Sequence, residues 1–150
     1  MKCKQFKTKK AEETKQLGRD LAHELQGGEV ILLIGEIGAG KTTFVQGIAA
    51  GLGIRRAIKS PTFTIVDVHK AHHKKIKTLV HLDGYRLSGS SLSDLGIDLH
   101  CGRADTVIAI EWPENLVFDL ADCESTHEVR IDHVAAERRE LFIKNKKIIN

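Results

Sequence analysis

Near the start of the chain, hydrophobic residues recur with a helical period. The apolar positions of this segment are Leu17, Leu21, Ala22 and Leu25, with polar residues between them. This spacing is typical of an amphipathic helix, and the glycine pair of Gln26-Gly27-Gly28 supplies a stop signal. The pattern predicts a first helix from Ala11 to Leu25.

The next hydrophobic segment is the continuous run Glu29-Val-Ile-Leu-Leu-Ile34. A short run rich in β-branched residues is typical of a strand buried on both faces in a parallel sheet. A glycine-rich turn follows, and Thr42 to Leu52 then has the composition of a helix that Gly53 ends. The sequence predicts a strand, a glycine loop and a helix in direct succession.

Further short hydrophobic segments, separated by turn signals, fill the rest of the chain. They predict a loop feeding a strand at Lys59 to Val66, strands at Lys77 to Asp83 and Thr106 to Ile110, and a closing hairpin of Val129 to Ile131 with Glu140 to Ile143. Ser88 to Leu99 is predicted to be a polar connection into a short helix.

This alternation of strands and helices predicts an α/β fold with a mostly parallel central sheet and flanking helices. The length of 150 residues fits a single domain over the whole chain. Ligands of open parallel sheets bind beyond the carboxyl ends of the strands. Because Gly35, Asp83 and Glu111 each stand at or directly after the end of a predicted strand, we expect them to gather on one rim.

The segment Gly35-Glu-Ile-Gly-Ala-Gly-Lys-Thr42 matches the phosphate-loop pattern GxxxxGK[ST] in full. Its glycines allow backbone angles that turn successive N–H groups inward around a phosphate, and the helix that follows aims its positive dipole end at the anion. The alternative is a chance glycine turn before a helix. The predicted nucleotide ligands are Gly35, Gly38, Ala39, Gly40, Lys41, Thr42 and Thr43, and the predicted architecture is a P-loop NTPase fold.

A hard cation such as Mg²⁺ takes oxygen ligands and keeps several waters, so one hydroxyl and one or two carboxylates suffice. The candidates for metal binding are the Thr42 hydroxyl and the carboxylates of Asp83 and Glu111, and Lys41 is placed to reach the β and γ phosphates. Surface caps or ion pairs are the alternative for the two acids. Thr62 lies in Ser60-Pro-Thr-Phe-Thr64, where its hydroxyl has access to Mg²⁺ or water if the segment senses the γ phosphate; a plain proline turn is equally compatible.

Composition narrows the class of protein without identifying its chemistry. The net charge of +3 is too weak to indicate nucleic-acid binding. No signal peptide or long apolar run is present, so we expect a cytoplasmic protein with no membrane partner. Three cysteines without CxxC spacing predict reduced thiols. The histidines at 69, 72, 73 and 81 have irregular spacing, which favours solvated surface over a metal site.

Five segments, in the same order, make residues 10–140 resemble the TsaE family, the P-loop ATPases of bacterial tRNA threonylcarbamoyladenosine biosynthesis. They are Gly35-Glu-Ile-Gly-Ala-Gly-Lys-Thr-Thr-Phe44, Lys59-Ser-Pro-Thr-Phe-Thr-Ile-Val66, His81-Leu-Asp-Gly-Tyr-Arg-Leu87, Leu95-Gly-Ile97 and Ile110-Glu-Trp-Pro-Glu114. The chain departs from the family at Gly84, where leucine is usual, and in the strongly basic segment 70–77.

The resemblance implies a protein that binds ATP and Mg²⁺, hydrolyses ATP and acts with TsaD and TsaB. That assembly threonylcarbamoylates the adenosine beside the anticodon of ANN-decoding tRNAs, and tRNA contact through the partner complex is possible. By motif match, Thr42 and Glu111 hold Mg²⁺, Asp83 orients metal or water, and Thr62 lies in a switch-like loop. The match also places Trp112 near the nucleotide and Arg138 near the base.

Two other functions share the phosphate loop. A small-molecule kinase would use Asp83 as the acceptor's base and Arg86 as a clamp, but it would also need an arginine-bearing lid. A non-hydrolytic nucleotide switch would need no turnover at all. Release of ADP without a phosphate acceptor separates an ATPase from a kinase, and absence of turnover even with partners favours the switch.

Overall fold

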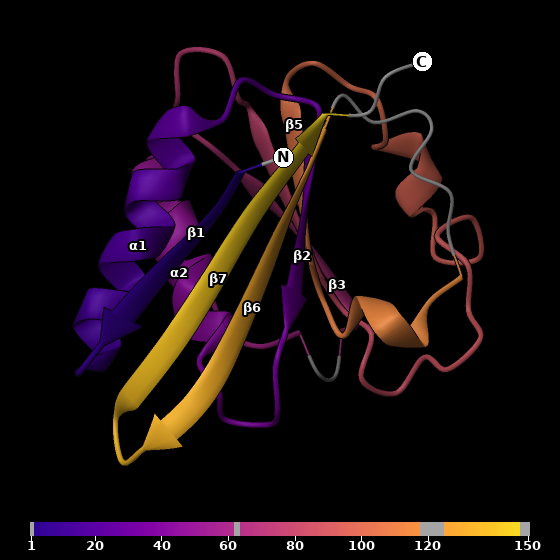
Figure 1. Cartoon of the computed structure of the whole chain (residues 1–150). Helices are drawn as coiled ribbons and strands as arrows, with labels where there is room; N and C mark the ends of the chain where they lie inside the picture. Colours follow the sequence, from indigo (N-terminus) through magenta and orange to yellow (C-terminus); the bar gives the residue numbers. More distant parts are fainter. Residues whose placement is uncertain (1, 62–63, 118–124, 148–150) are drawn as a thin grey trace.

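Figure 1 shows the computed structural model, which describes residues 2–61, 64–117 and 125–147, folded around one mixed sheet. Its strands are β1 (Lys2–Thr8), β2 (Glu29–Ile34), β3 (Val66–Lys70), β4 (Thr78–Asp83), β5 (Thr106–Glu111), β6 (Ser125–Ala135) and β7 (Arg138–Lys147). Its helices are α1 (Ala11–Glu24) and α2 (Lys41–Gly51), with short 3-10 turns η1 (Ile97–Leu99) and η2 (Pro113–Asn115). The predicted α/β class is confirmed.

The sheet has the order β1-β7-β6-β2-β5-β4-β3. Its four central strands, β6, β2, β5 and β4, run parallel, whereas β3 and the β1–β7–β6 side pair antiparallel. The prediction of a mostly parallel sheet therefore holds at the centre and needs correction at both edges. The reason is loop length: the connections between β3 and β4 and between β6 and β7 are too short for the crossover that parallel neighbours require.

Two strands differ from the sequence prediction. β1 pairs with β7 along its whole length, from Lys2 opposite Asn145 to Thr8 opposite Arg139, although its lysines give no clear strand pattern. Pairing with a segment more than 130 positions away along the chain is not encoded in local alternation. β3 begins only at Val66, because Ile65 adopts a left-handed backbone (φ 68°) that interrupts an extended segment.

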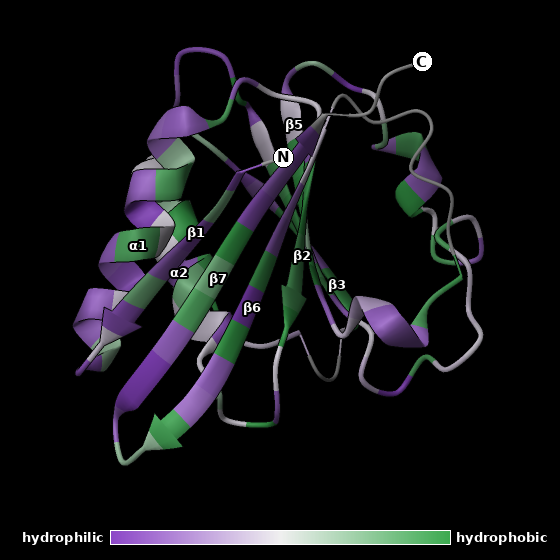
Figure 2. Ribbon diagram, viewed as in Figure 1, coloured by the Kyte–Doolittle hydropathy of each residue, from purple (hydrophilic) through white to green (hydrophobic). Residues whose placement is uncertain are grey.

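The helices cover one face of the sheet, and the segments that follow β4 and β5 cover the other (Figure 1). One core lies under α1 and α2 and includes Leu33, Phe44 and Ile48; the other includes Leu82 and Ile110. In Figure 2 the hydrophobic colour is nearly continuous along β2 and alternates along β6 and β7.

Among the described residues, no helix is long and apolar enough to cross a bilayer.

Two glycines set how closely the helices approach each other. A Cβ on Gly18 of α1 would lie 2.3 Å from the Phe44 carbonyl oxygen, and one on Gly47 of α2 would lie 2.0 Å from that of Lys15. Any side chain at either position would therefore push the helices apart. The close packing fixes α2, whose first turn carries the phosphate-loop residues, against the rest of the domain.

Candidate nucleotide and metal site

The glycine loop connects β2 to α2 with the geometry that its sequence predicts. Gly38 and Gly40 have φ of 77° and 109°, values that residues with a Cβ rarely adopt. The Ala39 N–H donates to the Glu36 carbonyl at 3.0 Å, which closes the turn. Helix α2 starts at Lys41, directly after Gly40, so its free N–H groups and positive dipole end face the loop.

Lys41 is held in the loop although it is charged and only 5% exposed. Its ammonium donates to the carbonyl oxygens of Gly35 and Glu36, and it lies 4.2 Å from the centroid of the Trp112 ring, within cation–π range. Burial lowers the pKa of Lys41, while the nearby carboxylates, Glu111 foremost, act in the opposite direction. A cation in this position is suited to attract the charge of a phosphate.

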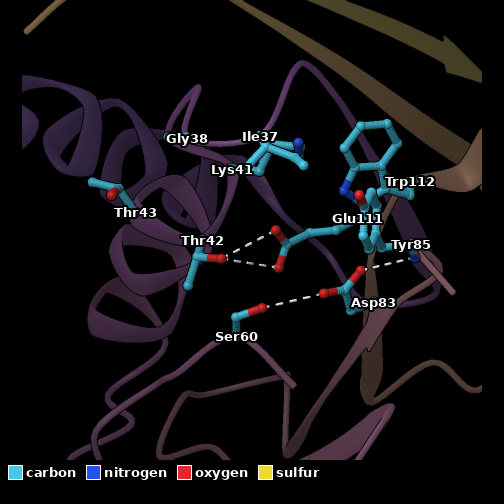
Figure 3. A pocket seen from close by; sticks show the side chains of 11 residues that line it. Ile37, Gly38, Lys41, Thr42, Thr43, Ser60, Asp83, Tyr85, Glu111 and Trp112 are labelled. Carbon is cyan, nitrogen blue, oxygen red and sulfur yellow. Dashed lines mark hydrogen bonds between the residues drawn. The ribbon is translucent and has the colours of Figure 1, made fainter. Parts of the chain in front are cut away.

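The two predicted acids lie side by side, because Asp83 at the end of β4 is in register with Glu111 at the end of β5. Figure 3 shows the Thr42 hydroxyl directed at the Glu111 carboxylate, with oxygen–oxygen distances of 3.1 and 3.2 Å. Glu111 is 4% exposed. On its inner side its Oε2 lies 2.6 Å from Nε2 of His81.

Asp83 has partners on both of its carboxylate oxygens. The Ser60 hydroxyl donates to Oδ2 at 3.2 Å, and the Tyr85 backbone N–H donates to Oδ1 at 3.0 Å (Figure 3). Asp83 is thereby linked to the segment that begins at Ser60 and leads toward Thr62. Thr62 itself lies outside the described residues, so its predicted role stays a prediction.

These side chains line a hollow of about 380 Å³ at the carboxyl ends of the parallel strands. Its described lining consists of Ile37, Gly38, Gly40, Lys41, Thr42, Thr43, Ser60, Asp83, Tyr85, Glu111 and Trp112. The expectation of one rim is confirmed for Asp83 and Glu111, which line the hollow together with the glycine loop. Gly35 is not part of this lining, but its carbonyl oxygen accepts a hydrogen bond from Lys41. Thr43 points away from the carboxylates in Figure 3, toward the far side of the loop.

The donor set of this hollow suits Mg²⁺. Thr42, Glu111 and Asp83 offer only oxygen atoms, and Mg²⁺ prefers oxygen ligands and retains waters. Among the residues that the structure describes, no group of three or more His, Cys, Asp or Glu side chains is arranged to hold a metal. A hydroxyl with one or two carboxylates is therefore the oxygen set that the geometry offers.

The sequence of this chain matches a known protein family over most of its length. The family profile described as threonylcarbamoyl adenosine biosynthesis protein TsaE matches residues 8–141. The chain belongs to the TsaE family. A Streptomyces coelicolor protein named tRNA threonylcarbamoyladenosine biosynthesis protein TsaE is 42% identical over 123 residues, covering 82% of this chain and 81% of that protein.

A Treponema pallidum TsaE is 36% identical over 137 residues, covering 91% of this chain and 96% of that protein. The crystal structure of Bacillus subtilis YdiB is similar with a TM-score of 0.69 at 29% identity, covering 97% of this chain and 86% of that chain. The recognition made from the five sequence segments is confirmed.

Four of the five segments that resemble the TsaE family contribute residues to the lining of the hollow, and one does not. The loop segment, the segment around Ser60, the segment around Asp83 and the segment around Glu111 each supply lining residues. Leu95-Gly-Ile97 instead packs on the opposite face of the sheet, where Ile97 is buried with Leu82 and Gly96 takes a left-handed backbone (φ 72°). This TsaE segment therefore has a structural place rather than a position in the hollow.

Gly84 lies where the ends of β4 and β5 come close together. Its N–H donates to the Glu111 carbonyl at 2.8 Å, and its carbonyl accepts from Asn115 Nδ2 at 3.1 Å. A Cβ at this position would lie 2.7 Å from the Trp112 carbonyl oxygen. The strand end that carries Asp83 is thus tied to the end of β5 by hydrogen bonds.

The arginine that contacts the phosphate loop is Arg139, which sequence analysis missed. Its Nε donates to the Ala39 carbonyl at 2.8 Å and its Nη2 to the Gly38 carbonyl at 3.2 Å. Arg138 is exposed and does not line the hollow. The available signal was strand alternation: Arg139 stands two positions before buried Leu141, so both face the helix side of the sheet.

A second, smaller hollow of about 140 Å³ lies on the other side of the loop. It is lined by Ala11, Thr14, Gly38, Ala39, Gly40, Thr43, Glu137 and Arg139. Thr43 lines both hollows. The glycine loop therefore lies between the larger hollow, which contains the carboxylates, and the smaller hollow, which is formed by the start of α1 and the β6–β7 turn. Sequence analysis predicted the loop residues of this lining, Gly38, Ala39, Gly40 and Thr43, as nucleotide ligands, and it gave no prediction for Ala11, Thr14, Glu137 or Arg139.

Two histidines predicted to be solvated are buried instead. His81 is 0% exposed and His69 is 3% exposed, whereas His72 is exposed. His69 and His81 lie on neighbouring strands and face the helix-covered side of the sheet, and their irregular sequence spacing hides this. Burial lowers the pKa of His69.

Proposed function

We propose that this chain is a Mg²⁺-dependent ATPase with a P-loop NTPase fold. In this proposal it acts with TsaD and TsaB in threonylcarbamoylation of the adenosine beside the anticodon of ANN-decoding tRNAs. The observation that carries the ATPase proposal is the hydrogen-bonded pair of Thr42 and Glu111 beside the glycine loop. Membership in the TsaE family carries the pathway.

The geometry supports one direction for the nucleotide. Loop N–H groups and Lys41 would bind the β and γ phosphates on the side of the carboxylates. Thr43, which lines both hollows, would meet the α phosphate. The ribose and base would then lie toward the second hollow, beside the start of α1 and Arg139.

The roles of the acids follow from their partners. Thr42 and Glu111 would hold Mg²⁺, with Asp83 close by; the metal, when bound, neutralises charge that develops on the phosphate oxygens. Asp83 would accept a hydrogen bond from water and orient it, because its carboxylate is fixed by Ser60 and Tyr85. Trp112 lies against Lys41 and closes that side of the hollow.

We expect a partner protein to supply an arginine to the γ phosphate. Lys41 is the cationic side chain in its described lining, and no arginine is part of that lining. Phosphoryl transfer by P-loop proteins accelerates by about 10³ to 10⁵ when an arginine neutralises transition-state charge. Hydrolysis by the isolated chain should therefore be slow and rise strongly with TsaD and TsaB.

Steady-state phosphate release from ATP, with and without purified TsaD and TsaB and without any acceptor, tests the proposal. The expected result is slow Mg²⁺-dependent ADP formation that the partners accelerate. Phosphate transfer that needs a small-molecule acceptor would point to a kinase. Nucleotide binding without turnover, even with both partners, would point to a non-hydrolytic switch and contradict the ATPase assignment.

A further inference from the structure

The inner side of Glu111 is occupied by a histidine whose position follows from the sheet register. His81 precedes Asp83 by two residues on β4, and its register partner Ala109 precedes Glu111 by two on β5. Side chains alternate along strands, so His81, Asp83 and Glu111 share one face. Nε2 of His81 lies 2.6 Å from Oε2 of Glu111.

Among the described residues, the contact with Glu111 is the hydrogen bond that the buried ring of His81 makes. The side chain is 0% exposed, and its Nδ1 has no hydrogen-bond partner among the described residues. A buried polar atom without a partner lowers stability, whereas an apolar side chain of similar volume would carry no such penalty. The bond to Glu111 is therefore the specific interaction that a histidine, rather than a leucine, provides here.

The bond also makes the two oxygens of Glu111 unequal. When Glu111 is ionised, its carboxylate only accepts hydrogen bonds, and Nε2 of His81 is then the donor of this bond. The Thr42 hydroxyl approaches both oxygens, at 3.1 and 3.2 Å, but His81 contacts Oε2 alone. Oε1 is left as the oxygen with fewer donors, and rotation of the carboxylate is restrained from behind.

We propose that His81 is a positioning residue for the metal site: it holds the Glu111 carboxylate so that Oε1 stays available to Mg²⁺ beside Thr42. This inference rests on the proposed function, because it requires Glu111 to be a metal ligand. Outer partners of metal ligands fix ligand orientation, and their loss typically weakens metal affinity by about 10- to 100-fold. His81 is not part of the described lining of the hollow, so in this proposal it acts through Glu111.

Calorimetric binding of β,γ-imido-ATP, in Mg²⁺ and in excess EDTA, tests this role without turnover. The ratio of the two affinities measures the gain from the metal. In His81→Leu the affinity in EDTA should match the parent, and the gain from Mg²⁺ should shrink by about 10- to 100-fold. His69→Leu is the matched control: His69 is a buried histidine on the neighbouring strand, and neither of its ring nitrogens has a partner among the described residues. Its gain should be unchanged.

Two amide variants separate positioning from packing. Glutamine places its NH₂ near the position of Nε2, whereas asparagine places it nearer Nδ1. His81→Gln should recover most of the gain from Mg²⁺ and His81→Asn should not, a comparison that stands even if His81→Leu fails to fold by circular dichroism. Equal gains in the parent and in both amide variants would overturn the inference. A parent that does not bind the analogue in either buffer would overturn the proposed function itself.

Discussion

Charged side chains are buried at the carboxyl-end rim of the parallel strands, whereas on the β6–β7 hairpin they are exposed. At the rim, Lys41 and Glu111 are 5% and 4% exposed. On the hairpin, Arg130 and Asp132 form an ion pair at 3.2 Å with side chains 61% and 41% exposed. Exposed pairs contribute about 0 to 1 kcal/mol, whereas burying charge is costly unless it is paired and hydrogen-bonded. The rim maintains an arrangement that stability alone does not favour, which is why we assign function there.

The largest expected effect is at Lys41. Lys41→Ala removes the buried ammonium that faces the phosphates, and hydrogen bonds to charged groups contribute about 1.5 to 3 kcal/mol each. We expect nucleotide affinity to fall by at least about 100-fold while thermal unfolding stays cooperative. Lys144→Ala, at an exposed position of β7, is the control and should bind like the parent. Near-parental affinity in a folded Lys41→Ala protein would refute the assignment of the loop.

Loss of the Glu111 or Asp83 carboxylate should reduce hydrolysis more than nucleotide binding. Glu111→Ala and Asp83→Ala remove oxygen ligands or water orientation, so partner-stimulated hydrolysis should fall by about 100-fold or more. The loop N–H groups remain, so nucleotide affinity measured in excess EDTA should change by less than about 10-fold. Asp132→Asn on the hairpin is the control for loss of a surface charge. If both rim variants hydrolyse ATP at the parent rate, the metal site lies elsewhere.

Arg139 joins the two regions, because it belongs to β7 and donates to the carbonyls of Ala39 and Gly38. Arg139→Ala should loosen the loop and weaken nucleotide binding by about 10-fold, the equivalent of one hydrogen bond to a charged group. Arg138→Ala, one position earlier and exposed, should change binding by less than about twofold. Calorimetry on the two variants distinguishes them, and the reverse ranking would support the sequence-based prediction for Arg138.

The smallest effect is on stability at acid pH, at the base of the hairpin. His127 on β6 is 3% exposed, and burial lowers its pKa while the carboxylates of Glu29 and Glu24 oppose the shift. The unfolded chain then binds a proton more readily than the folded chain, so stability is complete above about pH 6.5 and declines as pH falls toward the lowered pKa.

Chemical denaturation at several pH values measures this effect. His127→Leu should flatten the decline below about pH 6.5, whereas His23→Gln on the exposed side of α1 should leave it unchanged. A parent protein whose free energy of unfolding does not fall on acidification through this range would show that His127 does not contribute.

Sequence patterns located the rim because its signals are local. The glycines of the loop and the acids at the ends of apolar runs are read from adjacent residues, and the register of β4 with β5 brings Asp83 beside Glu111. The partners of those residues are not local. His81 and Arg139 reach the site through pairing of strands, which determines the face that each side chain occupies.

The edges of the sheet were harder to predict for the same reason. The lysines of β1 are exposed, and its strand conformation depends on pairing with β7 at the other end of the chain. The delayed start of β3 depends on the left-handed backbone of Ile65, which a β-branched residue rarely adopts. Hydrophobic alternation in the sequence predicts neither the strand conformation of β1 nor the start of β3.

The most direct test of the account is a crystal structure of this chain with β,γ-imido-ATP and Mg²⁺. We predict the triphosphate within the Gly35 to Thr42 loop, with Lys41 on its β and γ phosphates. Mg²⁺ should be bound by Thr42 and Glu111, and the base should lie toward the hollow beside Arg139. A triphosphate bound outside the loop, or a metal held without Glu111, would contradict the central claim.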